Sequence, residues 1–145
     1  MNVDVRTSAV IARPRQVVSA FAANPDNAPL WYRNIKTVSW KTERPLAVGS
    51  RIAFVAQFLG RRLEYTYEVV VWKPDEQFVM QTVDGPFPME TTYTFHKISG
   101  NLTRMTLRNR GTPSGFSKLF SPFMSMMMKK ANNNDLKSIK RLLEQ

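Results

Sequence analysis

Three tyrosines and one asparagine are placed where strand alternation would turn their side chains inward. Tyr65 and Tyr67 alternate with charged or polar residues over positions 62–69, and Tyr93 and Asn109 hold equivalent places in two later segments. A buried hydroxyl or amide requires a hydrogen-bond partner. Each of the four can therefore orient a ligand carbonyl or hydroxyl, and each can equally be satisfied by the protein itself.

General acid–base chemistry has three candidates, Tyr65, Asp84 and His96. Asp84 precedes a Gly-Pro turn, and a carboxylate beside an apolar opening can acquire a raised pKa, although most loop carboxylates are simply solvated. His96 follows Phe95, so alternation directs it to the outer face of its strand. Inside a cavity, His96 would be the best available general base.

The residue counts exclude several kinds of chemistry. The chain has no cysteine and one histidine in 145 residues. The absence of cysteine rules out disulfides, thiolate zinc sites and cysteine nucleophiles. A single histidine cannot form a site with several histidines, and it lacks a partner for a histidine-based triad. We expect neither a metal site nor a cofactor.

The charge is strongly basic, with 21 lysines and arginines against 11 acidic residues and a formal net charge of +10. Such a balance is typical of a protein that binds an anionic membrane surface, an anionic ligand or nucleic acid. It is also found in proteins whose surface is merely basic. No block of five like charges and no nucleic-acid recognition motif occurs, so nucleic acid is the least favoured partner.

The first residues lack a signal-peptide pattern, and no run approaches the ~18 apolar residues of a membrane span. We expect a cytoplasmic protein.

Seven extended segments and three helical ones follow from the periodicity. Pro14 suits the first turn of a helix, which Asn24-Pro25 ends, and a second short helix is expected over 26–30. The predicted strands cover 3–12, 31–40, 51–59, 62–71, 77–83, 89–95 and 103–110.

The C-terminal part predicts one long helix from Phe116 onward. Its apolar stripe is interrupted at 132–135, where asparagine is a poor helix former, so a bend or frayed turn is expected there. The stripe consists of Phe120, Phe123, Met124, Met127, Ala131, Ile139, Leu142 and Leu143.

One long helix covers seven strands only if the sheet curls around it. A curled sheet leaves a gap beside the helix, and gaps lined by apolar groups with a few polar ones resemble ligand sites. We therefore predict a single α+β domain over residues 1–145 with a ligand cavity between sheet and helix, and with Trp31 at its mouth. The predicted ligand-binding residues are Trp31, Phe54, Phe58, Tyr65, Tyr67, Tyr93, Phe95, Met105, Asn109, Phe120, Phe123, Met124 and Met127.

The order and spacing of several short motifs resemble the START-like or SRPBCC superfamily, most closely its polyketide cyclase/dehydrase-like branch. The matching pieces are Val10 to Pro14 followed by Val17-Val18, Asn24-Pro25-Asp26 with Trp31, Ile35 and Val38, Val48-Gly49-Ser50, Thr103 to Thr106, and Asp135-Leu136 with Lys140 and Leu143-Glu144. The resemblance implies a helix-grip fold, in which a curved seven-stranded antiparallel sheet wraps around a long C-terminal helix and two short helices follow the first strand.

The resemblance leaves three functions open. The first is binding, transport or sequestration of an apolar or amphipathic small molecule such as a lipid, a polyketide or a quinone-like ring. Burying ~300 Å² of such a ligand is worth roughly 7 kcal/mol before association costs. The second is a cyclase or dehydratase using the same cavity, although the catalytic clusters of aromatic cyclases have no clear match here. The third is docking of the basic surface on anionic lipid or nucleic acid. The oligomeric state is not predicted.

Overall fold

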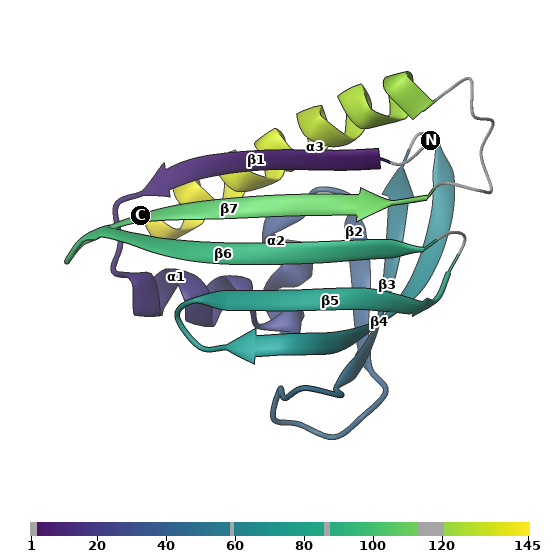
Figure 1. Cartoon of the computed structure of the whole chain (residues 1–145), viewed down its shortest axis with the longest axis horizontal. Helices are drawn as coiled ribbons and strands as arrows, with labels where there is room; N and C mark the ends of the chain where they lie inside the picture. Colours follow the sequence, from purple (N-terminus) through teal and green to yellow (C-terminus); the bar gives the residue numbers. More distant parts are fainter. Residues whose placement is uncertain (1–2, 59, 86–87, 113–120) are drawn as a thin grey trace.

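The computed structural model describes residues 3–58, 60–85, 88–112 and 121–145. Seven strands form one antiparallel sheet in the order β1-β7-β6-β5-β4-β3-β2, so that β1 and β2 are its two edges (Figure 1). The strands are β1 (Val3–Ile11), β2 (Ile35–Trp40), β3 (Arg51–Phe58), β4 (Arg61–Lys73), β5 (Gln77–Asp84), β6 (Met89–Ser99) and β7 (Leu102–Gly111).

Three α-helices and one 3-10 turn complete the described structure. The elements α1 (Arg15–Ala22), η1 (Pro25–Asn27) and α2 (Ala28–Trp31) connect β1 to β2, and α3 (Ser121–Leu143) follows β7. No helix in these described ranges combines the length and apolarity that a bilayer crossing requires. The predicted α+β helix-grip architecture is confirmed. The predicted helical residues Phe116 to Phe120 lie outside the described ranges.

Irregular strand pairing curves the sheet. The pairing of β4 with β5 shifts register at Thr66/Tyr67 and again at Val69/Val71, and β2 shifts against β3 between Ile35 and Thr37. Such irregularities bend a strand and increase its twist. In Figure 1, β2 and β3 accordingly stand steeply to β1, β7 and β6. The sheet is therefore strongly curved, and its concave face is directed toward α3.

The C-terminal end of α3 is fixed to the end of β1. Lys140 Nζ donates to the Val10 carbonyl at 2.7 Å, and the Ala12 amide donates to Glu144 Oε2 at 2.7 Å. Arg13 Nη1 donates to the Leu143 carbonyl at 2.8 Å. These contacts set the position of the helix across the concave face of the sheet.

The interruption predicted in the last helix is absent, because α3 is helical without a break through 132–135. Two of the four polar residues there lie on its buried side: Asn132 and Asp135 are only 4% and 3% exposed. Tertiary packing therefore overrides the weak local propensity.

The buried apolar residues form two clusters. The larger includes Trp31, Phe78 and Ile139, and it packs α1, α2 and the C-terminal part of α3 onto the sheet. The smaller joins the start of β1 and β6 to Met124 and Met128 of α3. Tyr67 packs against both clusters. The space between them is the site described next.

Candidate functional site

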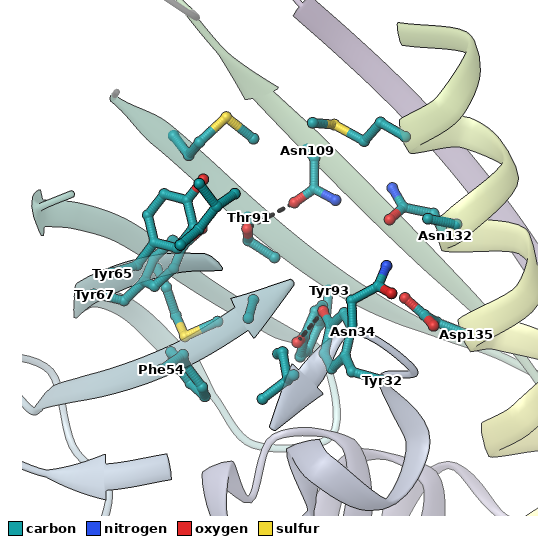
Figure 2. A pocket seen from close by; sticks show the side chains of 17 residues that line it. Tyr32, Asn34, Phe54, Tyr65, Tyr67, Thr91, Tyr93, Asn109, Asn132 and Asp135 are labelled. Atoms are coloured by element: carbon teal, nitrogen blue, oxygen red, sulfur yellow. Dashed lines mark hydrogen bonds between the residues drawn. The ribbon is translucent and has the colours of Figure 1, made fainter. Parts of the chain in front are cut away.

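A cavity of about 150 Å³ lies between the sheet and α3 (Figure 2). Apolar cavities of about this volume hold a molecule the size of benzene, and this one is also open on one side. Its lining residues come from the segment after α2, from the six strands β2 to β7 and from α3. They are Tyr32, Asn34, Ile35, Phe54, Ala56, Leu63, Tyr65, Tyr67, Met80, Met89, Thr91, Tyr93, Asn109, Met128, Ala131, Asn132 and Asp135.

Aromatic side chains and methionines form the sheet side of the cavity. Phe54 meets Tyr67 edge-on with ring centroids 5.8 Å apart, and Tyr65 lies 5.9 Å from Tyr67. Met80 and Met89 also line this side, and methionine adapts readily to the shape of an apolar guest. These side chains can bury an apolar ligand, but they do not fix its orientation.

Two tyrosine hydroxyls meet in the cavity wall. The hydroxyls of Tyr32 and Tyr93 are 2.5 Å apart, and either one can be the donor (Figure 2). Because one hydrogen fills this contact, the pair retains one O–H for a third group. Burial raises the pKa of both tyrosines above their ordinary value, so both are neutral donors at physiological pH.

A second set of polar side chains lies on the sheet. The Thr91 hydroxyl donates to Asn109 Oδ1 at 2.7 Å, and Tyr67 is hydrogen-bonded to Thr91. Burial raises the pKa of Tyr67 to about 12, against the opposing effect of Thr91. Burial likewise raises the pKa of Tyr65.

The helix side of the cavity is polar. Asn132 and Asp135 are one turn apart on α3 and point toward the cavity, near Asn34 and Asn109 (Figure 2). Asp135 Oδ1 accepts the Arg33 amide at 3.0 Å. Burial raises the pKa of Asp135 to about 6, even though the Arg33 amide and charge act in the opposite direction. Asn132 Nδ2 is buried without an acceptor among the described residues.

A recess on the surface adjoins the cavity on its helix side. It shares Asn34, Ala131 and Asp135 with the cavity, and the exposed residues Arg33 and Lys130 also line it. We infer that the cavity reaches solvent between the segment 33–34 and α3.

Five of the predicted ligand-binding residues line the cavity: Phe54, Tyr65, Tyr67, Tyr93 and Asn109. All five were placed on inward strand faces by alternation. Their contact with a ligand remains a prediction.

Three further predicted residues lie in the core and not in the cavity wall. Trp31 is 1% exposed, which corrects its expected place at the mouth, and its ring centroid lies 5.7 Å from that of Tyr93. Phe95 and Met105 face inward as predicted, but they pack in the larger cluster.

The predicted apolar stripe of the last helix is shifted. Phe123 is 48% exposed, Met124 is buried in the smaller cluster, and Met127 lines the recess. None of these three lines the cavity. The side chain of Phe58, and all of Phe120, lie outside what the structure describes.

The acid–base candidates Asp84 and His96 are separated from the cavity. Asp84 is exposed at the end of β5, and His96 is exposed opposite Arg104 on the outer face of β6. Of the three candidates, only Tyr65 lines the cavity.

The residues most informative about chemistry were missed at the sequence level. Asn132 and Asp135 were interpreted as a helix interruption, and Tyr32 as part of a strand. A usable signal was present, because two polar residues three positions apart interrupt an otherwise apolar helix face.

Ion pairs with the chain's own carboxylates leave its net charge of +10 unchanged. Among the described residues, such pairs are formed by Arg44, Arg51, Arg62, Arg108, Arg110 and Lys140. Docking of the basic surface on an anionic membrane stays a prediction.

The chain resembles solved structures over nearly its whole length. A START superfamily protein from Mycobacterium smegmatis superposes with a TM-score of 0.85 at 12% identity, covering 98% of this chain and 97% of that one. The protein TTHA0849 from Thermus thermophilus has a TM-score of 0.81 at 19% identity, with 95% and 94% covered. The Zhui aromatase/cyclase from Streptomyces sp. R1128 has a TM-score of 0.82 at 12% identity, with 99% and 94% covered. At such identities these similarities establish the fold.

The family comparison is more direct. Residues 2–144 match the model of the family described as polyketide cyclase/dehydrase and lipid transport. No curated protein matches the chain in sequence. With the family model spanning nearly every residue, the chain belongs to the polyketide cyclase/dehydrase and lipid transport family.

Proposed function

We propose that this protein binds an amphipathic small molecule in the cavity between the sheet and α3. The observation that carries the proposal is that the cavity lining combines apolar and aromatic side chains with a few polar groups, among them Asn132 and Asp135 of α3. Apolar burial supplies the affinity, at about 25 cal/mol per Å². The few buried polar groups fix the orientation of the ligand.

The family and its solved relatives support a ligand-binding role. The family description includes lipid transport, and one structural relative is described as an aromatase/cyclase. Both activities require that an apolar molecule leave water and enter the protein.

Extraction of the purified protein tests the proposal. We expect that organic extraction of natively purified protein releases a bound compound with an apolar body, detectable by mass spectrometry. After extraction and refolding, Nile red should bind saturably with one site per chain. An empty extract together with only unsaturable Nile red fluorescence would contradict the proposal.

Acid–base catalysis in the same cavity is the second candidate, and Asp135 is the observation that favours it. A buried carboxyl whose pKa is about 6 is close to the value at which a group exchanges protons efficiently near neutral pH. In an intramolecular aldol condensation, Asp135 would remove a proton from the carbon beside one carbonyl. That carbon then bonds to the second carbonyl carbon, whose oxygen takes up a proton. Loss of a second proton from the same nucleophilic carbon, together with departure of the hydroxyl as water, gives the enone. The neutral Tyr32–Tyr93 pair would donate to the carbonyl that accumulates negative charge.

Turnover of a simple diketone separates the two functions. Acetonylacetone closes to a methylcyclopentenone with loss of water, without any co-reactant. If the protein is such an enzyme, it accelerates this closure and Asp135→Asn slows it by about a hundredfold. The matched variant Asp4→Asn, on the outer face of the sheet, leaves the rate unchanged. Equal rates with and without protein would exclude this activity for this substrate and leave binding as the function.

A further inference from the structure

Asn132 presents a buried hydrogen-bond donor at the cavity. Its side chain is 4% exposed, and Nδ2 has no acceptor among the described residues. A buried unpaired N–H is costly, and native proteins rarely retain one without a purpose. The donor lies on the cavity side of α3 (Figure 2), where a ligand atom is a possible acceptor.

One turn further along α3, Asp135 offers the cavity a hydrogen-bond acceptor. Asp135 is 3% exposed, and its carboxyl accepts the Arg33 amide through Oδ1. None of the described residues that line the cavity is a lysine or arginine, although the chain as a whole carries a net charge of +10. The cavity therefore offers a carboxylate to a ligand and no cation.

A hydroxyl fits this pair better than other common groups. It accepts a hydrogen bond from Asn132 Nδ2 and donates one to the carboxylate of Asp135. A methyl group satisfies neither residue. A ligand carboxylate accepts from Asn132 but brings a second negative charge beside Asp135 at low dielectric, which is strongly unfavourable.

We propose that the cavity selects a neutral ligand with a hydroxyl at its α3 end, held between Asn132 and Asp135, and discriminates against the corresponding carboxylate. This selectivity rests on the proposed binding function and names the ligand class within it.

Three probes that share one ring system test the selectivity. At about pH 7.5, β-naphthol is neutral, β-naphthoic acid is ionised and β-methylnaphthalene is apolar. We expect β-naphthol to bind about tenfold more tightly than β-methylnaphthalene, as one additional hydrogen-bonded group allows. β-Naphthoic acid should bind about a hundredfold more weakly than β-naphthol. Competition with Nile red measures all three.

Two variants assign the effect to its residues. Asn132→Leu should remove the preference for β-naphthol over β-methylnaphthalene, and Asp135→Asn should improve β-naphthoic acid binding at least tenfold. The matched control Asn133→Leu changes the neighbouring asparagine, which does not line the cavity, and should alter neither ratio. Ratios of affinities on one variant cancel any loss of correctly folded protein.

The outcomes separate the selectivity from binding itself. If β-methylnaphthalene binds but the hydroxyl gives no advantage, or if Asn132→Leu leaves the ratio unchanged, the selectivity is wrong and the binding function stands. Tighter binding of β-naphthoic acid to the unaltered protein would also overturn it, because the carboxylate would then lie in the recess beside Arg33 and Lys130. If Nile red binds but none of the three probes displaces it, the selectivity is wrong; if Nile red does not bind either, the proposed function fails with it.

Discussion

Replacing Ala131 by phenylalanine is expected to weaken Nile red binding about a hundredfold while the protein remains folded. Ala131 lines both the cavity and the adjoining recess, so an aromatic ring at this position fills the passage between them. Displacing about 100 Å² of buried apolar ligand surface costs about 2.5 kcal/mol, which corresponds to nearly a hundredfold in Kd. Fluorescence titration of the extracted protein gives the Kd directly.

The same helix offers a matched control for this substitution. Lys137 is exposed on α3 and lines neither the cavity nor the recess, so Lys137→Phe adds the same ring at a position without ligand contact. The control should retain the affinity of the unaltered protein. Because the ring enters space that is already present, urea unfolding of Ala131→Phe should change by less than about 1.5 kcal/mol. Unchanged Nile red affinity in a folded Ala131→Phe protein would place the binding site elsewhere.

Strand alternation predicted which side chains face inward, but not which of them reach the cavity. Tyr93 and Phe95 are successive inward residues of β6, yet Tyr93 lines the cavity and Phe95 is packed in the core. The difference is their position along the strand, relative to α1, α2 and the C-terminal part of α3. That position depends on the curvature of the sheet, which comes from register shifts that no single strand's sequence reveals.

For α3, the sequence predicted the helix but not its continuity. Its length and amphipathic character were evident, but an asparagine-rich segment indicated a break on intrinsic propensity alone. Packing of Leu136 and Ile139 into the larger cluster, and of Met128 into the smaller one, keeps α3 continuous across this segment. The polar residues between these anchors are therefore held against the cavity, where they define its chemistry.

Asp135 is expected to make the stability of the protein decrease as the pH rises from about 4 to about 7. Burial raises its pKa from an ordinary 3.8 to about 6 in the folded chain. Between these two values the folded state binds more protons than the unfolded state, so its stability is greatest below the lower value and falls as the pH rises through the higher one. A shift of about two pKa units corresponds to about 3 kcal/mol in the free energy of unfolding. Asp135→Asn is neutral throughout and keeps an oxygen that can accept the Arg33 amide, so it removes this loss.

Urea unfolding across this pH range measures the effect as a difference between variant and unaltered protein. The variant should gain about 3 kcal/mol relative to the unaltered protein between about pH 4 and about pH 7.5. Asp4→Asn provides the opposite sign, because the hydrogen bond from Arg108 holds the pKa of Asp4 below its ordinary value and stabilises the folded state once Asp4 is ionised. A flat difference for Asp135→Asn would mean that this carboxyl is solvated when ionised, and the cavity would then lack the low-dielectric helix side on which its preference for neutral ligands depends.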